Sequence, residues 1–270
     1  MECFISISLS KGEFRDGLRL RYGLKIDDLP KVCDGCNAKF TVNHALSCKK
    51  GGLVVNRHNE IKEELAYIAT LAMSPSKVRD EPMIHTGRKI SDGNLPAHAR
   101  TQNSSNLPLN ESNNPTNVDD EKPFERGDIL IHGFYEKQTS CIIDVRVTDS
   151  DSPSNLSASP EKVLIRHEKE KKKKYLEACL EERRHFSPYV CDCYGLLGSE
   201  AKAVNKKLAA KLANKWKAPY SSTCGFINAR ISIAIIRATH LCLRGSRIPF
   251  RNMSSKWCQW DDGAGLLLPH

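Results

Sequence analysis

Two short apolar segments stand out in the pattern of hydrophobic and polar positions, residues 128–131 and 141–147. Both are rich in Ile and Val, which favour strands, and a turn at Gly133 followed by a polar connection separates them. The pattern predicts two adjacent antiparallel strands. Each segment contains one acidic residue, because Asp128 opens the first and Asp144 lies inside the second. Burial of a carboxylate costs free energy unless a partner compensates it.

The two aspartates allow two interpretations. Carboxylates at the ends of adjacent antiparallel strands can converge on one divalent cation, which offsets the cost of their burial. Alternatively, the segment is a plain hairpin in which one aspartate is exposed and the other forms a salt bridge. We favour the metal site, and the rest of the chain supplies further candidate residues for it.

Apolar positions at helical spacing predict helices in the remainder of the chain. The expected helices cover residues 11–22, 53–73, 161–182, 201–217 and 224–247. In the first, Phe14, Leu18 and Tyr22 form an apolar face that we expect to dock on the protein, with arginines on the other faces for a DNA backbone contact as the alternative. The last is apolar almost all round, which predicts a buried core helix.

Two of these helices carry charged residues that need an explanation. Helix 53–73 has an apolar face, and Glu60 and Glu64 lie one turn apart beside it. They form either a solvated acidic face or a third oxygen ligand beside the aspartates. In helix 161–182, Lys171 falls within the apolar stripe and Lys174 lies at its edge. We expect Lys169, Lys172 and Lys173 to be solvated or to bind phosphate, and Lys171 to belong to a site.

Composition narrows the class of protein. The 270 residues include 41 Lys and Arg against 32 Asp and Glu, a net charge of +9, which favours a polyanionic partner such as DNA over a basic protein without one. No apolar run approaches the roughly 18–20 residues of a membrane span, and the first residues lack the basic start of a signal peptide. Eleven cysteines, an odd number, favour an intracellular reducing compartment.

Four potential ligands are spaced as in a structural zinc site. The pattern is Cys33-x2-Cys36-x7-His44-x3-Cys48. Two cysteines two residues apart form a tight knuckle, and a histidine and a cysteine in the following turns complete a tetrahedron. The alternative is a set of reduced structural cysteines. A zinc ion would supply much of the folding free energy of so small a segment.

These elements define a domain organisation. We expect an N-terminal helical segment (1–30), a zinc knuckle (31–52), an α/β domain (53–250) and a loose tail (251–270). Residues 91–123 are rich in Asn, Ser and Pro and nearly free of apolar residues, which predicts a disordered insertion.

The order of these motifs resembles the C-terminal part of site-specific non-LTR retrotransposon polyproteins. In that family a CCHC zinc knuckle precedes a restriction-endonuclease-like domain of the PD-(D/E)xK superfamily, a mixed sheet flanked by helices. The resemblance covers roughly residues 10–250. It rests on the knuckle, RHNE at 57–60, RGD at 126–128, DVRV at 144–147 and EKKKKY at 170–175.

The resemblance implies metal-dependent nicking of DNA in the nucleus, with element RNA as a further partner. Asp128 and Asp144 would hold Mg²⁺ or Mn²⁺, and Glu64 would assist through water. Lys171 or Lys174 would orient the attacking water or stabilise the transition state, and Arg146 would hold the scissile phosphate.

The chain departs from the family pattern in three ways. Gly127 precedes Asp128 where the family has proline, and Arg146 occupies the position that is usually lysine in the superfamily. No polymerase motif occurs in the chain. These departures keep open a second class of function, a DNA- or RNA-binding module whose nuclease site has decayed. A purely structural zinc-knuckle protein would leave Asp144 unexplained.

Overall fold

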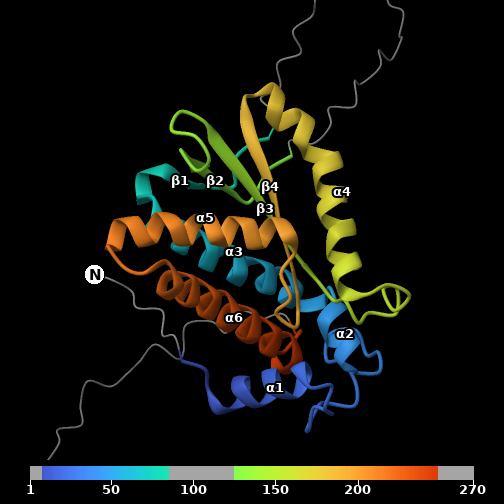
Figure 1. Cartoon of the computed structure of the whole chain (residues 1–270). Coiled ribbons are helices and arrows are strands. Elements are labelled where there is room, and N and C mark those ends of the chain that lie inside the picture. Colours follow the sequence, from blue (N-terminus) through green and yellow to red (C-terminus); the bar gives the residue numbers. More distant parts are fainter. Residues whose placement is uncertain (1–7, 85–124, 249–270) are drawn as a thin grey trace, which may run out of the picture.

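A four-stranded mixed sheet forms the centre of the protein (Figure 1). The structure is a computed structural model, and it describes residues 8–84 and 125–248. The expected disordered insertion at 91–123 and the expected tail at 251–270 lie outside the described residues.

The strands follow one another across the sheet in chain order. They are β1 (Val78–Asp80), β2 (Ile129–His132), β3 (Ser140–Thr148) and β4 (Arg184–Asp192). Strand β2 is antiparallel to both β1 and β3, and β4 is parallel to β3. The predicted antiparallel pair is therefore confirmed as β2 and β3, with Leu130 opposite Ile142.

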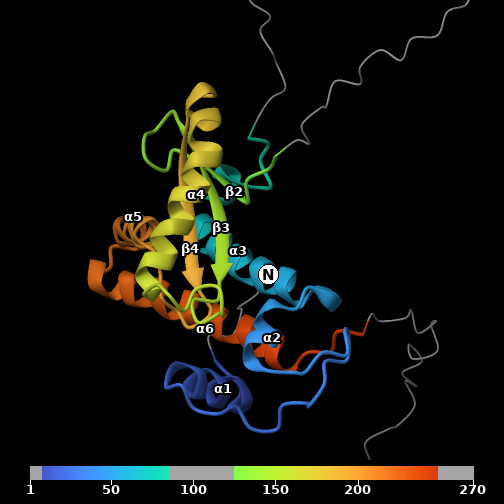
Figure 2. The same cartoon turned by 90° about the vertical axis from the view of Figure 1, so that its right-hand side faces the viewer.

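Helices cover both faces of the sheet. Helix α4 (Pro160–Glu181) connects β3 to β4, because two parallel strands require a crossover. It packs on the face that carries Ile142 and Phe186. The helices α3 (Leu53–Ala72), α5 (Ser199–Trp216) and α6 (Tyr220–Arg244) build the larger core on the other face. In Figure 1 α4 lies to the right of β3 and β4 and α5 to the left, and in Figure 2 α4 lies in front of β4.

The predicted core helix is confirmed in α6, although it begins and ends a few residues earlier than expected. Its apolar residues contact α3 and α5 in the larger core. By length and composition alone, α6 is the one helix among the described residues that could span a membrane, and half of its apolar window is buried in the protein. The packing explains its apolar character.

Strands β1 and β4 were not expected from the sequence. Strand β4 is buried over most of its length, so its residues do not alternate between apolar and polar. It also contains Pro188, which argues against a central strand. Because β4 lies at the edge of the sheet and pairs with β3 alone, the missing amide proton of Pro188 is tolerated.

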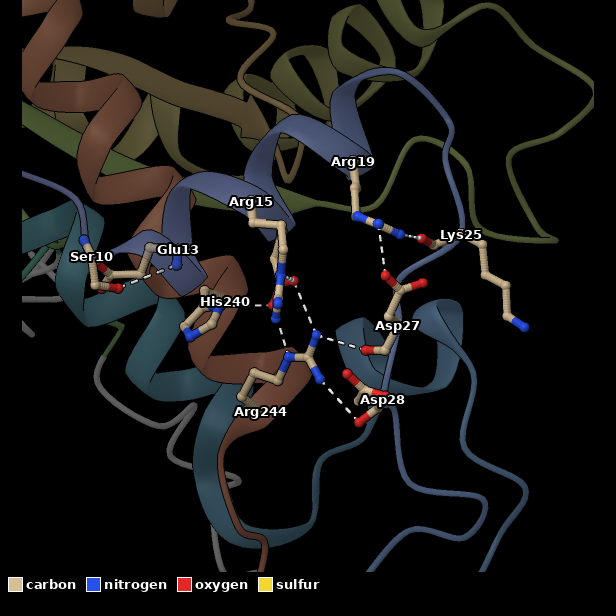
Figure 3. Close-up of polar contacts among 10 residues, drawn as sticks. Ser10, Glu13, Arg15, Arg19, Lys25, Asp27, Asp28, His240 and Arg244 are labelled. Carbon is tan, nitrogen blue, oxygen red and sulfur yellow. Dashed lines mark hydrogen bonds and ion pairs between the residues drawn. The ribbon is translucent and has the colours of Figure 1, made fainter.

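The N-terminal helix α1 (Lys11–Arg21) packs in the opposite way to the prediction. Its expected docking residues, Phe14, Leu18 and Tyr22, are 58%, 44% and 71% exposed, whereas Asp16 is fully buried. The Asp16 carboxylate accepts hydrogen bonds from Arg244 at 2.7 and 3.0 Å and lies 3.0 Å from His240 Nδ1. Figure 3 shows the His240 and Arg244 side chains of α6 directed toward α1. Charge pairing with α6 therefore sets the orientation of α1.

A glycine in α1, Gly17, allows this orientation. The Cα of Gly17 lies so close to α6 that an added Cβ would come within 2.9 Å of the Ile236 side chain. A capping box starts the helix, because the Ser10 hydroxyl accepts from the Glu13 amide and the Glu13 carboxylate accepts from the Ser10 amide.

We expect Asp16→Ala to lower the free energy of unfolding by about 3–5 kcal/mol, because it leaves Arg244 without its counter-charge at a buried contact. The matched control Phe14→Ala, on the exposed face of the same helix, should change it by less than about 0.5 kcal/mol. Urea unfolding of the two variants measures both values. A larger loss in Phe14→Ala would restore the docking face that the sequence predicted.

Candidate metal centres

The four predicted zinc ligands come together. The ligand atoms of Cys33, Cys36, His44 and Cys48 all lie within 4.8 Å of one another. The Sγ–Sγ distances are 4.0 Å for Cys33–Cys48 and 3.9 Å for Cys36–Cys48, and Cys36 Sγ lies 3.4 Å from His44 Nε2. A tetrahedron with Zn–S bonds of about 2.3 Å has S–S edges of about 3.8 Å. The cluster could therefore hold a zinc ion.

Local backbone structure positions these ligands. A turn after Cys33 returns the chain through Asn37, which adopts a left-handed conformation with φ of 60° and donates its amide to the Cys33 carbonyl at 2.9 Å. Thr41 then caps helix α2 (Val42–Ser47) by accepting from the His44 amide at 3.1 Å. The helix places His44 and Cys48 one turn apart on the same side.

The environment of Cys33 favours the thiolate that binds zinc. Burial raises the pKa of the Cys33 thiol, but hydrogen bonds from His44 and from the backbone amides of Gly35 and Cys36 outweigh it and bring the pKa to about 6. Zinc binds thiolate, so less free energy is lost to deprotonation at neutral pH.

Two buried arginines anchor the knuckle to the α/β domain. Arg57 of α3 donates to the Leu46 carbonyl at 3.0 Å, and Arg247 donates to the Ala45 carbonyl at 3.0 Å. Arg247 also lies 5.0 Å from the centroid of the Phe40 ring, within the range of a cation–π contact. Since both arginines bind carbonyls of α2 and its end, the conformation of the knuckle supports the start of α3 and the end of α6.

The two predicted metal-binding aspartates lie on neighbouring strands. Asp128 comes immediately before β2, and its backbone amide donates to the Ile143 carbonyl of β3 at 3.2 Å. Its Oδ2 accepts the Val145 amide of β3 at 2.6 Å. Because Val145 follows Asp144, these bonds hold the two acidic residues beside each other.

Asp144 is the more buried of the two, with 5% of its surface exposed. Lys171 of α4 reaches it, with Nζ 2.6 Å from Oδ2. The Lys171 ammonium group is therefore the basic partner that compensates the charge of this oxygen. Lys171, which the sequence placed within the apolar stripe of its helix, therefore contacts one of the two predicted aspartates.

The charge of Asp144 is incompletely compensated. Burial raises the pKa of its carboxyl group, Lys171 and His58 lower it, and the neighbouring Asp128 raises it; the net direction is upward. An ionised Asp144 therefore costs free energy in the metal-free protein, and a cation bound between the two carboxylates would reduce this cost.

His58 of α3 is a site residue to which the sequence analysis assigned no role. Its Nε2 lies 3.0 Å from Asp128 Oδ1, and 30% of its side chain is exposed. His58 lies in the RHNE segment that carries part of the family resemblance. Nothing in that segment indicates a contact with Asp128, which lies 70 residues later in the chain.

Glu64 is placed differently from the prediction. Both of its carboxylate oxygens pair with Arg230 of α6, Oε2 at 3.1 Å from Nη2, rather than with the two aspartates. Arg230 is buried and stacks on the Tyr67 ring at 4.6 Å, so it requires a counter-charge at this position. At Glu60, the other acidic residue of this face, burial raises the pKa of the carboxyl group more than Arg237 lowers it, so the net direction is upward. Neither residue supplies a third carboxylate to the pair.

The other two predicted residues form ion pairs of their own. Lys174 Nζ lies 2.9 Å from Glu125 and donates to the Tyr175 hydroxyl at 2.9 Å. Arg146 of β3 lies 2.8 Å from Glu170 of α4. Of the two candidate lysines, Lys171 is the one that contacts an aspartate of the pair.

We expect purified protein to contain one zinc ion per chain, and chelation to lower the thermal midpoint of the whole α/β domain. The reason is that α2 is tied to α3 and α6 through Arg57 and Arg247. Elemental analysis and circular dichroism measure both effects. Cys36→Ser should lose zinc, while Cys224→Ser, outside the cluster, should retain it. An unchanged midpoint after chelation would show that the knuckle contributes nothing to domain stability.

Comparison with known families and curated proteins identifies no relative of the chain. No protein-family model and no curated protein matches the chain. The residues of the two centres and their surroundings therefore provide the evidence for the function.

Proposed function

We propose that the protein cleaves phosphodiester bonds in DNA with a divalent metal ion, Mg²⁺ or Mn²⁺, held by Asp128 and Asp144. The observation that carries the proposal is the Asp144 carboxylate, buried beside a second carboxylate and facing a single lysine. A structural salt bridge would need no second acidic group there. The knuckle zinc would be structural.

The donor set fits such an ion. Mg²⁺ prefers oxygen ligands and is commonly bound through one or two carboxylates, with substrate phosphate oxygens and waters completing its shell. Among the described residues, the knuckle is the one group of three or more His, Cys, Asp or Glu ligand atoms within 4.8 Å of one another. The acidic centre thus offers two carboxylates, which agrees with an ion shared with the substrate.

The chemistry divides between the ion and the side chains. A bound divalent ion polarises the phosphate and lowers the pKa of a coordinated water. The Lys171 ammonium group, already beside Asp144, would stabilise the additional negative charge of the transition state or orient the water. Arg146, two residues along β3 on the same face, would exchange Glu170 for a phosphate oxygen of the DNA.

The arrangement of elements supports the same reading. Helix α3, three antiparallel strands, the crossover helix α4 and the parallel strand β4 form a mixed sheet flanked by helices, which is the architecture that the resemblance implies. The acidic residues lie at the start of β2 and within β3. With Arg146 at the usual lysine position and already paired with Glu170, the contact of Lys171 with Asp144 supports a working lysine that has moved to α4.

One observation favours the second candidate function, a nucleic-acid-binding module without nuclease activity. The charged side chains of the centre already have partners in the metal-free protein, Asp144 with Lys171 and Glu170 with Arg146. A centre paired in this way can stay folded without a metal ion, as a binding module with a decayed nuclease site would require. The two candidates differ in their response to Asp144→Asn.

If the metal-site proposal holds, Asp144→Asn abolishes nicking of supercoiled plasmid in Mg²⁺ or Mn²⁺, while zinc content and DNA binding persist. Asparagine preserves the shape of the side chain and removes one charge from the metal site. Agarose-gel conversion of supercoiled to open-circular DNA measures the loss, and Lys137→Gln in the β2–β3 connection is the control. Wild-type protein that never nicks in either ion would favour the binding module.

The same variant has a defined effect on stability in the metal-free protein. Because the pKa of Asp144 is raised in the folded state, its contribution to stability is unfavourable at neutral pH. That cost is relieved as the pH falls through the folded pKa toward the unfolded value of about 3.9. The Asp144→Asn variant should therefore be as stable as wild type or more stable at pH 7, and lose this advantage near pH 4. Urea unfolding at the two pH values checks the sign.

A further inference from the structure

We propose that His58 is a positioning residue of the acidic centre, whose imidazole fixes the Asp128 carboxylate for metal binding. The inference rests on the proposed metal-dependent function and extends it to a residue of helix α3. The resulting site takes its ligands from β2 and β3, its lysine from α4 and its positioning group from α3.

The contacts of Asp128 determine the orientation of its carboxylate. Oδ2 accepts the Val145 amide at 2.6 Å, and Oδ1 lies 3.0 Å from His58 Nε2. Two contacts on different oxygens fix both the position and the plane of the group. Each carboxylate oxygen has two lone pairs, so each can accept one hydrogen bond and still bind a cation.

The tautomer of His58 follows from this contact. An ionised carboxylate only accepts hydrogen bonds, so Nε2 must carry the proton and donate it to Asp128. Donation to a metal-binding carboxylate is the type of outer contact that orients ligands around an ion. The role requires a donor at the Nε2 position and does not require that the imidazole be charged.

His58 is itself held on a rigid support. It follows Arg57, which is 3% exposed and donates to the Leu46 carbonyl beside the zinc knuckle. The side chain of His58 therefore extends from a turn of α3 that Arg57 anchors to the knuckle. Loss of the contact would leave Asp128 with the Val145 amide as its one fixed partner among those described here.

A direct ligand role for His58 fits the geometry less well. Among the described residues its ring nitrogen does not form a compact ligand group with both aspartates, since the knuckle is the one such group within 4.8 Å. Its contact is with Asp128 Oδ1 alone. This is the arrangement of a residue that contacts a metal ligand and does not itself bind the ion.

Calorimetric titration of zinc-loaded protein with Mn²⁺ tests the inference without relying on activity. Loss of an outer partner of a metal ligand typically weakens affinity about 10–100-fold, and we expect a loss of that size in His58→Ala. Two polar replacements separate positioning from general structure. Glutamine can present an amide donor near the Nε2 position, so His58→Gln should keep most of the affinity. Asparagine is too short, so His58→Asn should lose it.

A histidine away from the centre provides the control. His132 of β2 is exposed and contacts Ser140, so His132→Ala should bind Mn²⁺ like wild type. Zinc content and thermal midpoint establish that each variant is folded. Equal Mn²⁺ affinity in wild type, His58→Asn and His58→Ala would overturn the role of His58 while leaving the metal site intact. Wild-type protein that binds no Mn²⁺ would overturn the proposed function, and the inference with it.

Discussion

The cost of burying charge governs how the elements of this protein pack. Charged side chains lie at several contacts between helices and at the contact between the knuckle and the α/β domain, where they are matched by a partner of opposite charge or by carbonyl groups. Asp16 joins α1 to α6, and Glu64 joins α3 to α6 through Arg230. Arg57 and Arg247 fasten the knuckle through carbonyl oxygens. These contacts specify orientation, because a buried charge without its partner costs several kcal/mol.

The carboxyl groups of Asp144 and Asp16 differ in the direction in which the protein shifts their pKa values. Burial raises the pKa of Asp16, but Arg244 and His240 outweigh it and leave the pKa below its usual value. At Asp144 the same competition ends the other way, since one lysine does not offset burial and the adjacent Asp128. Burial also raises the pKa values of Asp149 and Asp192. Asp144 is distinguished from them by the Lys171 ammonium group, 2.6 Å from its Oδ2. Functional sites commonly retain such a cost.

The sequence was sufficient for features that depend on local pattern. The β2–β3 pair, α3, the core helix α6, the knuckle ligands and the inward-facing Lys171 all follow from periodicity or spacing. Features that depend on partners distant in the chain were not predictable. Phe14 appeared to be a docking residue because nothing local indicates that Asp16 meets Arg244. Glu64 appeared to be available as a third ligand because Arg230 lies 166 residues later. The role of His58 was missed for the same reason.

The central claim is that Asp128 and Asp144 bind one divalent ion together. Its most direct test is a crystal structure of the zinc-loaded protein soaked in Mn²⁺, with anomalous scattering to locate the ions. Our account predicts one manganese peak within bonding distance, about 2.2 Å, of an oxygen of each aspartate. It also predicts that Lys171 Nζ moves away from its 2.6 Å contact with Asp144. A structure in saturating Mn²⁺ with no peak between the aspartates and with the Lys171 contact unchanged would contradict the account.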